Sequence, residues 1–341
     1  ITGLARGNRY LLYVAIYVIG IILSGVGPGA IPTLAIIPVL AIPVALKAGM
    51  NPILLSLIGQ MGAQCVRMSP ITPEAVVVRD LMVEQGLDGN TLPAMWSLWA
   101  TEIVMIIAAF IFFKGWKFDK PLESVELEEA SHFSPKQILT LIGLLAMIAC
   151  VVVFGFDVGL TSLVIGTILL VCGCADEKVV IKSIPWNTIL MVLGVGVLMN
   201  VVIEMGGIDL ISEALLAIMT PATAAPIIAF ISSILSFFSS TTGVVIPTMV
   251  PTIGTIVDSL GTGSAGFISL TSVMISSSLS SAFSPASTGG GLILAAYMAA
   301  SNSENKEQEQ QKLFGRLFMI AIACVIANII LSAVGVYGII K

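Results

Sequence analysis

Two polar, helix-breaking stretches inside strongly apolar sequence constrain the fold of this chain more than any other feature. Residues 24–33 read SGVGPGAIPT and residues 239–248 read SSTTGVVIPT. The offset between them is 215 residues, and Ser69-Pro70 and Ser284-Pro285 repeat that offset. At membrane depth, such backbone is tolerated only where it is buried in protein or lines a wet cavity. The shared offset therefore predicts an internal duplication whose broken segments mark a transport site.

The composition places this duplication in a membrane. Hydrophobic residues make up 57% of the chain and charged residues only 10%, whereas a soluble domain carries about 25% charged residues. The chain is therefore predicted to be an all-α polytopic membrane protein with the lipid bilayer as its surroundings. No basic cluster is long enough to suggest a nucleic-acid partner.

The same composition argues against enzyme chemistry. The single histidine, His132, lies in a polar loop, and the five cysteines lie in or beside apolar runs. Cys172 and Cys174 could bind a metal, but zinc sites need three or four ligands at set spacings. An intramembrane enzyme would need a metal set or a nucleophile with a base, and no His-Glu-x-x-His motif is present. We therefore expect no enzyme activity and no resident cofactor.

The first part of the chain is predicted to be a partial inverted repeat. Over residues 1–113 we expect a re-entrant hairpin around 24–33, a helix broken at 69–73 and a plain span over 92–113. The polar residues 114–137 are predicted to form a cytoplasmic linker.

The second inverted repeat is predicted over residues 138–341. It would contain scaffold helices over 138–219, a hairpin around 239–248, a helix broken at 284–291 and a final span. The scaffold helices have no counterpart in residues 1–113. The duplication therefore predicts about three further membrane segments before Ile1.

The distribution of basic residues supports two inverted repeats. If each hairpin enters and leaves on its own side, most of the 15 Lys and Arg residues fall on one face. Because cytoplasmic loops are enriched in Lys and Arg, the first hairpin is predicted to open to the cytoplasm. The residues on that face are Arg6, Arg9, Lys47, Lys114, Lys117, Lys120, Lys136, Lys178, Lys182, Lys306, Lys312 and Arg316.

The broken stretches offer groups for both an anion and a cation. Unwound backbone exposes carbonyl oxygens for a hard cation such as Na⁺, and helix N-termini expose N–H groups for an anion. The alternative is that these small residues only permit close helix packing. The predicted substrate-binding residues are Ser24, Gly25, Gly27, Pro28, Arg67, Ser69, Pro70, Thr72, Ser240, Thr241, Thr242, Ser284, Ser287 and Thr288. The predicted cation-binding residues are Ser239, Ser240, Thr241, Gly243, Ser284 and Gly289.

Arg67 lies two residues before the first predicted helix break. A charge is costly inside a membrane, so an intramembrane arginine indicates a functional site by default. A substrate carboxylate is one natural partner, and a structural pair with Glu74 or Asp80 is the alternative. The sequence leaves these two interpretations open.

The motifs also resemble a known family. The segment from Gly27 to Pro32, followed by Ser69-Pro70-Ile71-Thr72, resembles malonate and dicarboxylate carriers of the MatC type, which belong to the ion transporter superfamily alongside the divalent anion/sodium symporters. Ser240-Thr241-Thr242 looks like the counterpart of the Ser-Asn-Thr hairpin tip of those symporters, with Thr241 replacing the asparagine. The region from Ser284 to Thr288 looks like the facing unwound loop.

This resemblance implies an elevator-type secondary transporter, usually dimeric, that carries a dicarboxylate with a cation. We accordingly expect a homodimer in a bacterial-type inner (plasma) membrane, carrying a malonate- or succinate-like dianion with Na⁺ or H⁺. The alternative is a proton-coupled or inorganic-ion exchanger of the same superfamily. Proton exchangers place acidic residues inside their spans, and this chain offers few: Glu74, Asp80, Glu102 and Glu204.

Overall fold

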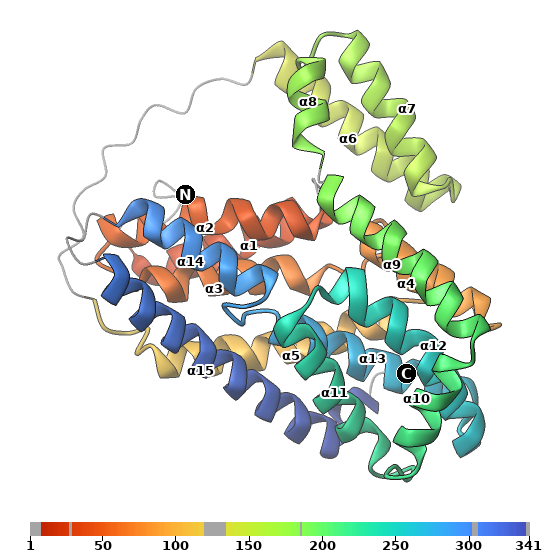
Figure 1. The fold of residues 1–341 in the computed structure, drawn as a ribbon. Helices are drawn as coiled ribbons and strands as arrows, with labels where there is room; N and C mark the ends of the chain where they lie inside the picture. Colours follow the sequence, from red (N-terminus) through yellow and green to blue (C-terminus); the bar gives the residue numbers. More distant parts are fainter. Residues whose placement is uncertain (1–7, 27–28, 119–133, 185, 302–305, 339–341) are drawn as a thin grey trace.

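A computed structural model describes residues 8–26, 29–118, 134–184, 186–301 and 306–338 (Figure 1). Every regular element in this part of the chain is a helix, as predicted. The first five are α1 Arg9–Val26, α2 Ala30–Lys47, α3 Pro52–Cys65, α4 Pro73–Glu84 and α5 Leu92–Phe112. The middle five are α6 Pro135–Phe154, α7 Val158–Val171, α8 Glu177–Ser183, α9 Trp186–Glu204 and α10 Gly207–Leu216. The last are α11 Ala224–Phe238, the π-helix η1 Thr241–Val245, α12 Ile246–Leu260, α13 Gly263–Ser281, α14 Thr288–Ala300, α15 Lys306–Ala333 and the short η2 Val336–Gly338.

Several of these helices are long and apolar enough to cross a membrane. A hydrocarbon core of about 30 Å needs about 20 helical residues. Four described segments meet a length and hydropathy criterion, and they are Ala30–Lys47, Leu92–Phe112, Thr241–Leu260 and Glu307–Ala333. Shorter apolar helices lie beside them, including α1, α11 and α14. The short lengths follow from the interruptions that the sequence predicts.

The interruptions at the two repeated stretches are narrower than predicted. Residues 24–33 and 239–248 are predicted from the sequence to be helix-breaking, and this is wrong for most of these residues, which are helical. α1 continues to Val26 and α2 begins at Ala30, while Gly27 and Pro28 lie outside the described residues. In the second stretch only Ser239 and Ser240 are extended, and the helix resumes at Thr241.

The shared Ile-Pro-Thr sequence does not end a helix in either copy. Pro32 lies in the first turn of α2, where a missing N–H costs nothing. Pro247 lies at the start of α12, directly after η1. The following threonines make the same contact in both copies. Thr33 Oγ1 donates to the Gly29 carbonyl at 2.7 Å, and Thr248 Oγ1 donates to the Val244 carbonyl at 2.8 Å.

The two helices predicted to be broken at the Ser-Pro pairs are interrupted in the structure. α3 ends at Cys65 and α4 begins at Pro73, whereas α13 ends at Ser281 and α14 begins at Thr288. The second break is shorter than predicted, because residues 288–291 of the predicted break are already helical.

The turns that close these two breaks are the same. The Ser69 N–H donates to the Val66 carbonyl at 2.9 Å, and the Ser284 N–H donates to the Ser281 carbonyl at 3.2 Å. Three residues further on, the Thr72 N–H bonds Ser69, and the Ser287 N–H bonds Ser284, both at 2.9 Å. Each bond recurs at the offset seen in the sequence, so the two breaks contain the same pair of hydrogen-bonded turns.

The packing of the helices also recurs, with an exchange of partners. α1 packs on α3 and α11 packs on α13, while α2 packs on α14 and α12 packs on α4. Two hydrophobic cores result. One joins α1, α2 and α3 to α14 and α15, and the other joins α11, α12 and α13 to α4 and α5. Each core therefore contains helices from both halves of the chain.

α1 and α3 approach one another until their backbones touch. A β-carbon on Gly20 would collide with the Gly59 carbonyl oxygen, and one on Gly62 would collide with that of Tyr17. Glycine is needed at both positions because only the absence of a side chain permits this separation.

α6, α7 and α8 stand away from this bundle (Figure 1). α6 and α7 pack against each other and expose large apolar side chains. The most exposed of these include Phe154, Leu160, Leu163 and Val171.

Candidate functional site

A cavity of about 180 Å³ lies where residues 239–242, the predicted second tip, meet both helix breaks. Its walls come from α2, the break after α3, the tip before η1, and the break before α14. The lining residues are Ile31, Leu34, Arg67, Ser240, Thr241, Ala282, Ser287 and Thr288. Arg67 is the only charged residue among them.

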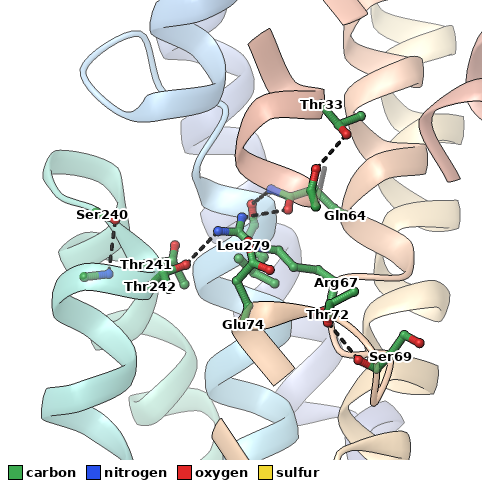
Figure 2. Close-up of polar contacts among 12 residues, drawn as sticks. Thr33, Gln64, Arg67, Ser69, Thr72, Glu74, Ser240, Thr241, Thr242 and Leu279 are labelled. Carbon is green, nitrogen blue, oxygen red and sulfur yellow. Dashed lines mark hydrogen bonds and ion pairs between the residues drawn. The ribbon is translucent and has the colours of Figure 1, made fainter. Parts of the chain in front are cut away.

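Arg67 connects the first break to the second tip (Figure 2). Arg67 is only 4% exposed. Nη2 donates to Thr242 Oγ1 at 2.7 Å, Nη1 donates to Gln64 Oε1 at 2.9 Å, and Nε lies 3.3 Å from Glu74 Oε1. Of the two predicted carboxylate partners, Glu74 is therefore the one present. The pairing with Asp80 is wrong, because Asp80 pairs with Arg79 on the surface.

The second tip is held by its own hydroxyl groups. Ser240 caps η1, since its Oγ accepts from the Gly243 N–H at 3.2 Å. Thr241 Oγ1 lies 2.7 Å from Ser236 Oγ and also donates to the Ser278 carbonyl at 3.4 Å. These bonds fix the start of a helix at the cavity wall, where free N–H groups favour an anion.

The facing break is tied to this tip. Ser287 Oγ donates to the Ser239 carbonyl at 3.3 Å. Ser287 and Thr288 lie at the start of α14, so a second helix N-terminus meets the same cavity. The arrangement brings one guanidinium, several hydroxyl groups and two helix starts to one small volume.

A comparison with known families gives one match. The family model described as citrate transporter (CitMHS) matches residues 1–268. The chain belongs to the citrate transporter family. No curated protein and no solved structure matches it. As a citrate transporter family member within the ion transporter superfamily, the chain is a multi-pass membrane transporter and not an enzyme.

In this family member, the structure brings only part of the predicted substrate site to the cavity. Arg67, Ser240, Thr241, Ser287 and Thr288 line it. Thr242 does not line the cavity, but it accepts a hydrogen bond from Arg67, which does. The other described substrate residues do not line the cavity, and they are Ser24, Gly25, Ser69, Pro70, Thr72 and Ser284; Gly27 and Pro28 lie outside the described residues.

Several of these other residues shape the breaks. Thr72 Oγ1 donates to the carbonyls of Arg67 and Ser69 at 2.6 and 2.7 Å, which closes the first break. Ser284 Oγ accepts from the Ala286 N–H at 3.2 Å in the second break. The Gly289 N–H bonds the Ala282 carbonyl at 3.1 Å. A role in contacting substrate or cation remains a prediction for them.

Two buried glutamines beside the cavity are not among the residues predicted from the sequence. Gln60 Nε2 donates to the carbonyls of Leu34 and Gly289 at 2.8 and 3.2 Å, and Gln64 Nε2 donates to the Leu279 carbonyl at 3.2 Å. Both side chains are fully buried. Their signal was present in the sequence, because two amides four residues apart in an apolar helix share one face.

The structure adds nothing to the metal alternative. Within the described ranges, no group of three or more His, Cys, Asp or Glu side chains is placed to hold a metal ion. Cys172, one of the two cysteines considered, is exposed. The Na⁺ ligands predicted from the sequence would instead be oxygens of the tip and the break.

Proposed function

We propose that this chain carries a small organic anion with two or more carboxylates, and binds it in the cavity beside Arg67. The observation that carries the proposal is the buried guanidinium of Arg67 in a wall otherwise made of hydroxyl groups, helix starts and apolar side chains. A cavity of about 180 Å³ is smaller than the ~300 Å³ at which drug-sized ligand sites begin. Its size therefore suits a short carboxylate.

The substrate is proposed from two sources. The family description favours citrate. The resemblance of the tip and break motifs to MatC-type carriers favours malonate or succinate. All of these molecules can place one carboxylate on Arg67 and another near the helix starts at Thr241 and Thr288.

The transport cycle is proposed to be of the elevator type, built on two inverted repeats with re-entrant hairpins. The recurrence of the break turns and the exchange of helix partners between the two cores support this proposal. We further propose a homodimer in a bacterial-type inner membrane. The exposed apolar faces of α6 and α7 would then contact lipid and the second subunit.

The coupling ion is proposed to be Na⁺, held by oxygens of Ser239, Ser240, Thr241, Gly243, Ser284 and Gly289. One observation favours the alternative of proton coupling. Glu102 in α5 is fully buried, and neither of its carboxylate oxygens has a hydrogen-bond partner among the described residues. An acidic side chain in such a place indicates a proton site in many transporters.

Uptake into proteoliposomes tests these proposals. Radiolabelled citrate, malonate and succinate are offered with an inward Na⁺ gradient, with a proton gradient, and with neither. We expect one of the three to accumulate, and to do so with the Na⁺ gradient. Accumulation driven by the proton gradient alone would favour the alternative. Absence of uptake of all three carboxylates by protein that is folded and reconstituted would overturn the proposed substrate class.

A further inference from the structure

The charged cluster around Arg67 occurs in only one of the two repeats. At the 215-residue offset, Arg67 corresponds to Ala282, and Gln64 corresponds to Leu279. Glu74 likewise corresponds to Gly289. Ala282 lines the same cavity as Arg67, so two equivalent positions face one site and only one of them carries a charge. This difference gives the site a charged side and an uncharged side.

Glu74 lies on the charged side and depends on Arg67. It is in the first turn of α4 and is only 3% exposed. Its Oε1 lies 3.3 Å from Arg67 Nε, and its Oε2 has no hydrogen-bond partner within the described residues. A buried carboxylate is costly unless it is paired, so the Arg67 guanidinium provides the compensating charge.

The same pair limits what Arg67 offers to a ligand. Two of its N–H groups already donate to Gln64 and Thr242, and its charge is balanced by Glu74. A carboxylate that enters the cavity therefore meets a guanidinium that is already neutralised. It must share Arg67 with Glu74 or displace the Glu74 carboxylate.

We propose that Glu74 acts as a built-in competitor that weakens anion binding at Arg67. Its carboxylate compensates Arg67 when no substrate is bound, and its negative charge repels the bound anion and speeds its release. Transport needs binding that is strong enough for capture and weak enough for release, and Glu74 sets this balance. The inference rests on the proposed function, because it requires a substrate carboxylate at Arg67.

Glu74→Gln tests this role, since the substitution keeps the size of the side chain and removes its charge. Equilibrium binding of radiolabelled citrate to the purified protein, competed with malonate and succinate, is measured together with uptake. We expect the dissociation constant and the half-saturation concentration to fall about ten-fold or more. The maximal uptake rate should fall as well, because release becomes slow. Glu84→Gln, an exposed change in the same helix, should alter neither quantity.

Two further variants keep the test decisive. Glu74→Asp retains the charge but shortens its reach, so binding should be intermediate between wild type and Glu74→Gln; this variant replaces Glu74→Gln if the latter does not fold. Weaker or unchanged binding in the variant that is measured would overturn the inference. Arg67→Gln with Glu74→Gln should fold but bind no carboxylate.

The outcomes separate the inference from the proposed function. If wild-type protein binds none of the three carboxylates, the proposed function fails and the inference fails with it. If wild-type protein binds and transports one of them, but removal of the Glu74 charge does not tighten binding, only the inference fails.

Discussion

The side chain of Gln64 donates a hydrogen bond of 3.2 Å to the carbonyl of Leu279, which lies 215 residues away. The same offset separates residues 24–33 from residues 239–248, so it pairs Leu279 with Gln64. The bond therefore joins offset-related positions of α3 and α13, the two helices that end at the breaks. Arg67 and Ala282 follow three residues later in each copy, at the cavity wall. The cavity thus lies between the two helix breaks.

Removal of Arg67 alone should damage folding as well as transport. Arg67→Ala leaves Glu74 buried without its counter-charge, which costs about 3–5 kcal/mol. We expect a lower unfolding temperature of the purified protein and no uptake. The neutral pair Arg67→Gln with Glu74→Gln should recover most of the stability but not the uptake. Uptake by the double variant at the wild-type half-saturation would contradict a role for Arg67 in binding.

Loss of a tip hydroxyl should weaken substrate binding. Each charge-assisted hydrogen bond is worth about 1.5–3 kcal/mol, or about ten- to a hundred-fold in affinity. Ser240→Ala and Thr241→Ala should therefore raise the half-saturation concentration strongly. Ser284→Ala should raise it too, because Ser284 holds the turn that presents Ser287. Cys172→Ala is the control, because Cys172 is exposed and does not line the cavity. Uptake is measured at equal expression, and wild-type kinetics in all three hydroxyl variants would place the site elsewhere.

The glycines between α1 and α3 should not tolerate a side chain. Gly20→Ala and Gly62→Ala would push a methyl group into a backbone carbonyl, at a cost of about 1–3 kcal/mol. Gly166→Ala in α7 is the matched control, because a β-carbon there has nothing within 4 Å. It should be neutral or stabilising by up to about 1 kcal/mol. Thermal unfolding in detergent measures all three, and equal stability of the three variants would mean that α1 and α3 lie further apart.

Glu102 is expected to lower the free energy of unfolding of the protein. Its two carboxylate oxygens are buried without hydrogen-bond partners in the described part of the chain. Glu102→Leu should therefore raise the free energy of unfolding, by about 1–3 kcal/mol. Thr101→Val is the opposing control, because it breaks the 3.1 Å bond between Thr101 Oγ1 and the Tyr337 hydroxyl. A destabilised Glu102→Leu protein would mean that the carboxylate has a partner after all. If the carrier is proton-coupled, Glu102→Leu should also abolish its response to a proton gradient.

The features that depend on local chemistry could be predicted from the sequence. Apolar runs of helical length predicted an all-helical membrane protein, because hydropathy and length act within each segment. The repeated Ser-Pro pairs predicted the two broken helices, since proline removes a donor and disfavours helix just before it. The same motifs placed the chain in the ion transporter superfamily, which the match to the citrate transporter family supports. The MatC-type assignment and the substrate contacts of Thr241 and Ser287 stay predictions. The interruptions predicted from the sequence are too wide. Pro32 lies in the first turn of α2, which accepts proline, and the second helix resumes at Thr241 and continues through Pro247.

Which side chains contact one another could not be predicted from the sequence and depends on the tertiary packing. Whether Arg67 pairs with Glu74 or Asp80 was open in the sequence, because both carboxylates lie within reach along the chain. The packing of α4 buries Glu74 against Arg67 and leaves Asp80 on the surface. Thr242 contacts Arg67 although 175 residues separate them, and Leu279 contacts Gln64 although 215 residues separate them. Contacts of that kind depend on how whole helices pack, which no local propensity encodes.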